Sequence, residues 1–269
     1  MNLREPAIPA GLPIPADLAL PAGPGRPGLA VEVATWAPIE VVDVDGWSVG
    51  LSAGFTRRAN SVVARSGPAD PDAALDHAEA LYAAYGLPPV VRVCADSRPD
   101  DLDGILERRG YRIVAPTSVM VAALGQGAPT TGVTSATSVT STSEPSRAWL
   151  AGWLDVKTST AGAVDLAVAR GILCGSRAAY LMDEDTGGVA GVLRAAFADG
   201  WVGLSCLTVA PRARRRGVGR VLTIAALELA RRRGADRAFL QVETSNTGAV
   251  ALYRGLGFVV ADRYHYRQR

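Results

Sequence analysis

The sequence predicts an α/β protein that contains two copies of one folded unit. An apolar, β-branched run at residues 201–209 leads through a glycine-containing turn into an amphipathic helical pattern, which is the order strand, loop, helix. The same order of elements occurs 147 residues earlier, where residues 91–111 align without a gap on residues 238–258. The chain is therefore expected to repeat its fold in tandem.

Length and composition limit the functions that such a fold can serve. The chain has 269 residues, of which 48% are hydrophobic, enough for one large domain or two small ones. Its formal net charge of +2 is too small to favour nucleic acid or a membrane surface as a partner. The N-terminus lacks the pattern of a signal peptide, and no apolar run is long enough to span a membrane. The three cysteines lack metal-ligand spacing, so a cytoplasmic protein without a metal is expected.

The first copy is expected at residues 31–124. It follows a segment, residues 1–30, whose clustered prolines and glycines predict an extended or irregular chain, because proline fixes φ and lacks a donor. Strands are predicted at 47–51, 60–64, 90–94 and 118–124, and helices at 72–85 and 99–109. Residues 125–145 are rich in Gly, Ser and Thr, which predicts a flexible linker.

The second copy is expected at residues 146–269. Helices are predicted near 149–154 and 164–173, then strands at 180–182, 189–193 and 201–209. Pro211 stops the last of these strands, and the glycine turn leads into a helix with one apolar face. A strand at 239–243 and a helix that begins at Asn246 complete the pattern.

The turn after residue 209 has the chemistry of an anion site. It reads Arg-x-x-Gly-x-Gly, with Arg214, Gly217 and Gly219. A helix start presents unpaired amides and a positive dipole end, and glycine lets the backbone approach a phosphate closely. A P-loop would need Gly-Lys-Ser/Thr, and a dinucleotide fingerprint would need glycine or alanine where Leu222 stands. Both of these nucleotide-binding alternatives fail.

The turn resembles the acetyl-CoA loop of the GCN5-related N-acetyltransferases (GNAT), in which Arg/Gln-x-x-Gly-x-Gly/Ala follows a Leu-x-Val-x-Pro strand. A second stretch, Asn246 followed by Leu252-Tyr253-x-x-x-Gly257-Phe258, resembles the second signature of that family at the usual distance. The resemblance covers roughly residues 146–266. It implies a mixed central sheet flanked by helices in each copy. It also implies that the acetyl group of acetyl-CoA moves to a primary amine by direct attack.

The resemblance further implies where acetyl-CoA binds. In the family, the strands equivalent to 202–209 and 237–243 splay apart and the pantetheine arm lies in the gap. Backbone groups beside the gap would bind this arm, amides of the turn would hold the pyrophosphate, and arginines would add charge-assisted contacts. The expected cofactor-binding residues are Leu207, Thr208, Val209, Arg214, Arg215, Arg216, Gly217, Val218, Gly219, Arg220 and Asn246. The alternative for the arginine run is a solvated face or a nucleic-acid patch.

Tyr253 and Glu243 are the expected catalytic residues. A tyrosine with an ordinary pKa of about 10 stays protonated at neutral pH, so Tyr253 can protonate the departing CoA thiolate as general acid; the alternative is core packing. Asn246 is expected to cap its helix and to contact the cofactor, or to serve as a structural cap alone. Several family members place a glutamate where Gln241 stands, and Glu243, on the same side of the strand, is the nearest substitute base. A water chain or an already neutral amine is the alternative.

The first copy lacks the residues that would bind acetyl-CoA. Pro99 and Leu106 stand opposite Asn246 and Tyr253, and the loop at 65–70 has no paired glycines. This copy is therefore expected to bind acetyl-CoA poorly or not at all and to play a structural role. In the alternative hypothesis, part of it lines the substrate cleft, through Thr56, Arg57, Arg58 and Asn60.

Two other functions remain open from the sequence. The first alternative is a non-catalytic acyl-CoA-binding or sensor protein with a vestigial acceptor pocket. Mycothiol synthase is also a tandem member of the superfamily, so a similar acetyltransferase is a further alternative. The acceptor amine is not identified by the sequence, and a monomer and a homodimer are both compatible with it.

Overall fold

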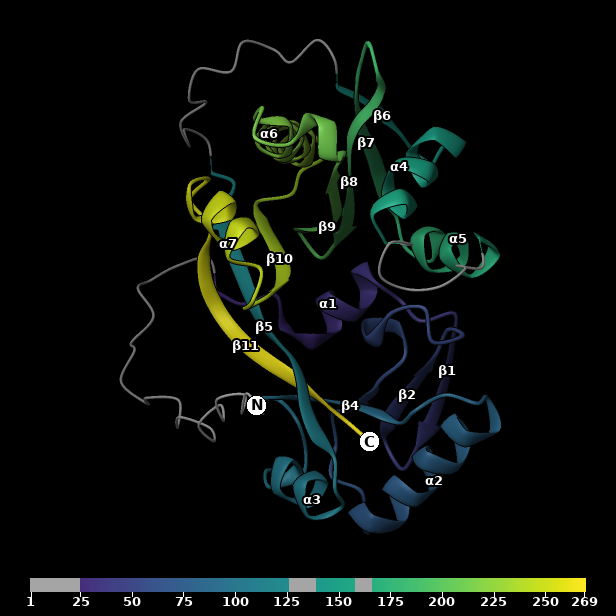
Figure 1. The fold of residues 1–269 in the computed structure, drawn as a ribbon. Coiled ribbons are helices and arrows are strands. Elements are labelled where there is room, and N and C mark those ends of the chain that lie inside the picture. Colours follow the sequence, from purple (N-terminus) through teal and green to yellow (C-terminus); the bar gives the residue numbers. More distant parts are fainter. Residues whose placement is uncertain (1–24, 126–138, 158–165) are drawn as a thin grey trace, which may run out of the picture.

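Eleven strands form a single mixed sheet in the computed structural model, which describes residues 25–125, 139–157 and 166–269 (Figure 1). The strand order is β1-β2-β3-β4-β11-β5-β10-β9-β8-β7-β6. The strands are β1 Glu40–Val44, β2 Trp47–Leu51, β3 Val62–Ala64, β4 Val90–Cys94, β5 Arg112–Ala123, β6 Val139–Thr142, β7 Ala178–Asp185, β8 Gly188–Ala198, β9 Trp201–Val209, β10 Arg237–Glu243 and β11 Val259–Gln268.

Helices cover both faces of this sheet. They are α1 Gly28–Thr35, α2 Pro71–Ala84, α3 Leu102–Arg108, α4 Arg147–Lys157, α5 Leu166–Cys174, α6 Val218–Arg232 and α7 Thr247–Arg254. Two short 3₁₀ helices, η1 Arg57–Ala59 and η2 Pro211–Ala213, lie in the connections. Among the described residues, no helix is long and apolar enough to cross a membrane.

The repeat expected from the sequence is present in the order of the elements. α2, β4, α3 and β5 of the first half correspond to α6, β10, α7 and β11 of the second half. The first residues of three of these elements, Pro71, Val90 and Arg112, each lie 147 positions before Val218, Arg237 and Val259. The same pattern of apolar positions has therefore produced the same elements twice.

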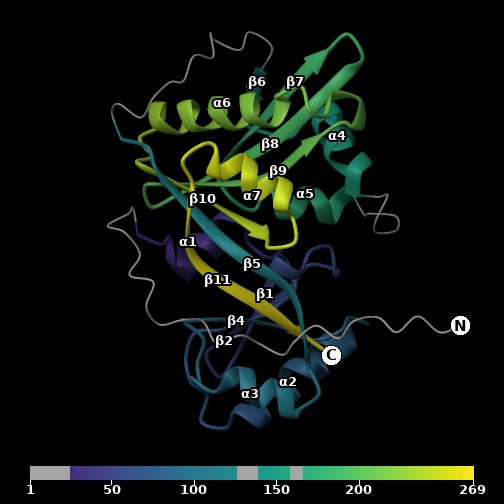
Figure 2. The same cartoon turned by 60° about the vertical axis from the view of Figure 1, so that its left-hand side comes forward.

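The last strands of the two halves are exchanged. β11 pairs with β4 of the first half on one side and with β5 on the other. β5 in turn pairs with β10 of the second half. Figure 2 shows β5 and β11 running side by side across the middle of the molecule. The two expected units, residues 31–124 and 146–269, therefore contribute to one continuous sheet rather than to two.

Each region of the sheet has its own core. One apolar cluster joins α6 to one face of β7–β10, and a second joins α4 and α5 to the other face through Trp149 and Trp153. A third cluster packs α2 and α3 against β1–β4 around Trp47 and Tyr82. Apolar faces spaced at the helical and strand periods explain this layering.

Four elements differ from the sequence-based expectation. α1, β1 and β11 lie in stretches for which no element was predicted. In α1, the β-branched residues Val31 and Val33 lower the helical signal. The prediction of a flexible linker is wrong for residues 139–142, which form the edge strand β6 against β7. Three of its four residues, Val139, Thr140 and Thr142, are β-branched and favour a strand. The rest of the predicted linker, from 126 to 138, and residues 1–24 lie outside the described residues.

Candidate active site

Strands β9 and β10 separate part of the way along their length. Residues Trp201–Leu204 of β9 pair in parallel with Arg237–Leu240 of β10, and the pairing stops there. Beyond this point Cys206 has a φ of +59°, and the pairing of β9 with β8 shifts register between Val192 and Arg194. The shift leaves one extra residue on β9, which is a β-bulge. A β-bulge bends its strand away from its neighbour. The separation exposes backbone edges of both strands.

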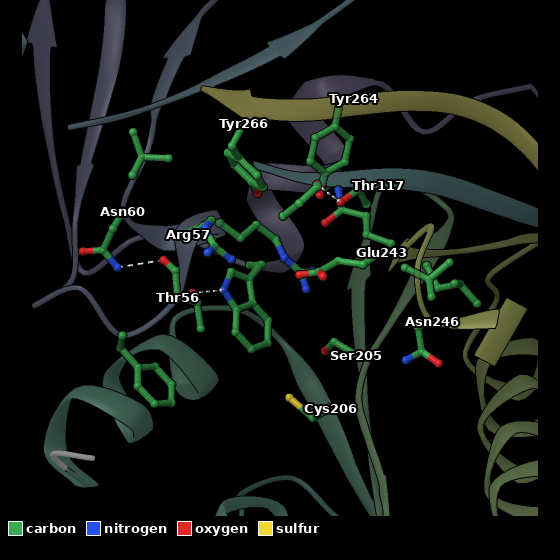
Figure 3. Close-up of a pocket in the computed structure, with 18 of the residues that line it drawn as sticks. Thr56, Arg57, Asn60, Thr117, Ser205, Cys206, Glu243, Asn246, Tyr264 and Tyr266 are labelled. Atoms are coloured by element: carbon green, nitrogen blue, oxygen red, sulfur yellow. Dashed lines mark hydrogen bonds between the residues drawn. The ribbon is translucent and has the colours of Figure 1, made fainter. Parts of the chain in front are cut away.

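The gap between the strands opens into a cleft of about 730 Å³. Both halves of the chain contribute to its walls (Figure 3). From β9, β10 and α7 come Ser205, Cys206, Leu207, Thr208, Gln241, Glu243, Asn246 and Tyr253. From the first half come Trp36, Phe55, Thr56, Arg57, Arg58, Asn60 and Thr117, and from β11 come Tyr264 and Tyr266. The alternative in which the first copy lines the cleft is therefore correct in its geometry.

Tyr253 is held rigidly at the wall of the cleft. It lies on α7 with 6% of its surface exposed, and its ring contacts that of Phe258 edge-on, with 5.6 Å between centroids. Burial raises the pKa of its hydroxyl well above the usual value, because the phenolate would be poorly solvated there. The phenol therefore stays protonated at every physiological pH.

Asn246 and Glu243 lie close together in sequence at the same wall. The side chain of Asn246 caps α7 by accepting a hydrogen bond from the amide of Ala249 at 3.0 Å. Both residues line the cleft, and Glu243 is exposed. The cap leaves the amide group of Asn246 with donors to spare.

Gln241 is oriented by a buried carboxylate. Its Nε2 donates to Glu32 of α1, which also forms an ion pair of 2.5 Å with Arg92. Glu32 is 4% exposed and Arg92 5%. A carboxylate paired with an arginine only accepts hydrogen bonds, so the nitrogen of Gln241 must face it. Oε1 of Gln241 is left buried with no hydrogen-bond partner among the described residues.

The predicted anion loop leads into α6, whose N-terminus has no side-chain cap. Gly217 is the N-cap of α6, with a φ of +83° and no side-chain capping bond. A Cβ at this position would meet nothing within 4 Å. The amide of Val221 donates to the carbonyl of Gly217 at 3.0 Å, whereas the amides of Gly217, Val218 and Gly219 have no acceptor among the described residues. The helix start thus has the open amides that an anion needs.

In the corresponding helix of the first half, α2, a side chain already binds the first amides. Asp70 caps α2, and its Oδ1 accepts hydrogen bonds from the amides of Asp72 at 3.0 Å and Ala73 at 3.1 Å. A carboxylate therefore already occupies the place where an anion would bind in the second half.

The arginines of the loop have different partners. Arg212 and Arg216 both pair with Asp185, whose pKa is lowered by the amide of Gly187 and then by Arg212. Arg214 Nε donates to the carbonyl of Val209 at 3.4 Å, and an amino group of Arg220 donates to Gly255 at 3.2 Å. Arg216, which was expected to contact a phosphate, thus forms an ion pair with Asp185 instead.

The predicted site residues fall into two groups. Leu207, Thr208, Glu243, Asn246 and Tyr253 line the cleft. Val209 and residues 214–220 lie outside its lining, but they approach it through Gly219, whose Cβ position is 3.6 Å from Val209 and 3.7 Å from Leu207. Sequence reasoning missed the aromatic residues Trp36, Tyr264 and Tyr266, which come from segments without a motif. Among the described residues, no cluster of His, Cys, Asp and Glu could hold a metal ion.

The sequence of this chain matches a known protein family. A family described as "Probable histone acetyltransferase Rv0428c C-terminal" matches residues 30–267. The chain belongs to this family of GNAT N-acetyltransferases. It is accordingly an acetyl-CoA-dependent N-acetyltransferase, an acyltransferase of class EC 2.3.1.-.

Individual GNAT proteins resemble the chain over most of its length. The uncharacterized N-acetyltransferase YobR of Bacillus subtilis is 27% identical over 237 residues, which are 87% of this chain and 94% of YobR. A GCN5-related N-acetyltransferase from Kribbella flavida has a TM-score of 0.59 and 18% identity, over 88% of this chain and 90% of that one. A tandem GNAT protein from the clavulanic acid biosynthesis pathway has a TM-score of 0.54 and 16% identity, over 74% of this chain and 69% of that one.

The similarity to mycothiol acetyltransferases is confined to a short segment. The protein from Salinispora arenicola is 55% identical over 53 residues, which are 19% of this chain and 17% of that protein.

Proposed function

We propose that the second half of this acetyltransferase transfers the acetyl group to a primary amine by direct attack inside the cleft, with Tyr253 as general acid. The observation that carries the proposal is the separation of β9 from β10 beyond Leu204 and Leu240, into a cleft that Leu207, Thr208 and Tyr253 line together. The first half, residues 31–124, is in this proposal a degenerate copy that supplies a wall of the acceptor site.

The residues of the chain divide the binding of acetyl-CoA between two regions. Free backbone groups of Leu207, Thr208 and Val209 on the separated edge of β9 would bind the pantetheine arm, and Asn246 would contact it from α7. Backbone amides of residues 215–220 would hold the pyrophosphate, with Arg214 and Arg215 adding charge. Arg216 would have to leave or share Asp185, with which it pairs at 3.0 Å.

Tyr253 and Glu243 would handle the two protons of the reaction. Acetyl-CoA supplies the thioester carbonyl that the amine attacks. The Tyr253 hydroxyl donates its proton to the sulfur as the carbon–sulfur bond breaks, and solvent restores it. Glu243, or a water molecule beside it, accepts the proton that the amine nitrogen loses. A backbone amide near Val209 stabilises the charge on the carbonyl oxygen.

Replacing Tyr253 tests this assignment. Tyr253→Phe should lower kcat by about 100-fold or more, because general acid catalysis contributes on this scale, and should leave the affinity for acetyl-CoA unchanged. Release of free thiol with an amine panel measures kcat, and Tyr85→Phe, at an exposed tyrosine outside the cleft lining, is the control. Because burial raises the pKa of Tyr253, ionisation of this group should not reduce wild-type kcat up to about pH 10.

The same experiment separates the enzyme from an acyl-CoA sensor. Tight binding of acetyl-CoA without thiol release on any amine would contradict the proposed catalysis and favour the sensor. Retention of full turnover in Tyr253→Phe would remove this tyrosine from the mechanism. The short match to mycothiol acetyltransferases, over 19% of the chain, does not favour their substrate over other amines.

A further inference from the structure

We propose that the acceptor of this enzyme is an amine that also carries an anionic group, a carboxylate or a phosphate, which Arg57 and Arg58 of the first half bind. The inference rests on the proposed function of the cleft and specifies its substrate class. It follows from the charges that line the cleft and from how the first half holds them.

The charged groups of the cleft are distributed unevenly. Its lining contains two arginines, Arg57 and Arg58, and one acidic residue, Glu243. The arginines lie on η1 of the first half, whereas Glu243 lies on β10 of the second half. Figure 3 shows Arg57 and Glu243 reaching into the cleft from opposite sides. A ligand with a positive and a negative end would match both walls.

Both arginines have neutral partners. Arg57 Nε donates to the side-chain oxygen of Gln268 at 3.4 Å, and the guanidinium of Arg58 lies 4.6 Å from the centroid of the Trp36 ring. In the part of the chain that the structure describes, no carboxylate forms an ion pair with either, whereas Arg92, Arg109 and Arg267 each have at least one such partner. The charge of both cleft arginines is therefore available to a ligand.

The turn that carries the arginines is rigidly built. Asn60, which is 5% exposed, accepts hydrogen bonds from the amides of Ser52 at 2.7 Å and Gly54 at 2.9 Å. Its Nδ2 donates to the carbonyl of Thr56 at 2.8 Å, and the hydroxyl of Thr56 accepts from Trp36 Nε1 at 3.2 Å. A loop fixed in this way loses little conformational entropy when it binds a ligand.

Guanidinium groups suit the ligand proposed. Their planar fork of donors matches the oxygen pairs of carboxylate and phosphate, and such charge-assisted hydrogen bonds are about twice as strong as neutral ones. The remaining wall is largely aromatic, with Trp36, Phe55, Trp153, Tyr264 and Tyr266. An acceptor with an apolar body between its amine and its anionic group would therefore fit the cleft.

Matched pairs of amines test the proposal through thiol release. Phenylalanine is compared with phenethylamine, and phosphoethanolamine with ethanolamine, so that each pair differs only in the anionic group. We expect kcat/KM at least about tenfold higher for the anionic member of one pair, which also tells carboxylate from phosphate. Arg57→Gln/Arg58→Gln should abolish this preference, because kcat/KM for the anionic member of the pair falls to that of the uncharged member. Arg65→Gln, an exposed arginine of the same half outside the cleft lining, should preserve it.

A binding measurement separates this proposal from the proposed function. N-acetylphenylalanine and N-acetylphenethylamine are titrated calorimetrically into the protein with CoA, where no turnover is needed. Binding of the charged product that depends on the two arginines, without turnover on any amine, would overturn the catalysis and support the anion site. Turnover of charged and uncharged amines with equal kcat/KM, or a preference that survives in the double variant, would overturn the anion site. Absence of both binding and turnover would overturn both.

Discussion

At the residue scale, the pair of Glu32 and Arg92 explains why position 241 is a glutamine. Glu32 already places one buried carboxylate beside this position, and Gln241 Nε2 donates to it. A second carboxylate at position 241 would repel that of Glu32 in a site of low polarity, whereas the amide of a glutamine donates a hydrogen bond to it. The base found at this position in other family members is therefore incompatible with the interior that this chain has built.

Arg92→Met should destabilise the protein by about 3–5 kcal/mol, because it leaves Glu32 buried with its main charge partner removed. Urea denaturation measures the loss. The double variant Glu32→Gln/Arg92→Met should be much more stable than the two single losses added together, since neither charge is then left alone. A double variant as unstable as that sum would show that the two residues act independently.

The sequence could place Gln241 on its strand, since the strand period and the family motif locate it. Its partner could not be found in the same way. Glu32 lies 209 positions earlier, in a helix that lacks a strong helical pattern. Contacts between residues so far apart depend on tertiary packing, which local propensity does not encode.

At the element scale, two corresponding helices begin in opposite chemical states. α6 begins at a glycine with its amides open, and α2 begins at Asp70, whose carboxylate occupies the same amides. The sequence was sufficient to predict this contrast, because glycine and aspartate at a helix start act through local backbone geometry. The bulge at Cys206, which opens the cleft, had no comparable local signal.

Gly217→Asp should weaken acetyl-CoA binding at least about tenfold relative to Gly217→Asn, at low salt. Both side chains have similar size and both tolerate a positive φ, so the difference isolates the negative charge beside the helix start. Equilibrium binding of acetyl-CoA to the two variants measures it. Equal affinities would mean that the anion does not bind at α6.

At the scale of the whole molecule, the exchange of β5 and β11 makes the two halves one cooperative body. Met120 of β5 belongs to the first half by sequence, yet it is fully buried in the core that contains Leu240 and Tyr253 of the second half. The sequence predicted the last strand of the first half from the local apolar run at 118–124, but it predicted no strand at 259–268, where β11 lies. It could not assign their partners, because either strand has the composition to pair in either place.

Met120→Ala should therefore destabilise both halves together, by about 2–5 kcal/mol. We expect one unfolding transition in calorimetry for the wild type and the variant, and parallel loss of amide protection in β4 and β10 by hydrogen exchange. Two separate transitions, or lost protection in only one of these strands, would contradict a shared core.

The exchanged strands also set what evolution can discard from this chain. A duplicated half whose helix start is capped by a carboxylate would be free to diverge if it folded on its own. Here its removal would take away β5 and strip β10 and β11 of a shared neighbour in the middle of the sheet. Selection for a stable sheet therefore acts on the first half as well, and this half is at hand for the role given to it in the proposed function, the wall of the acceptor site.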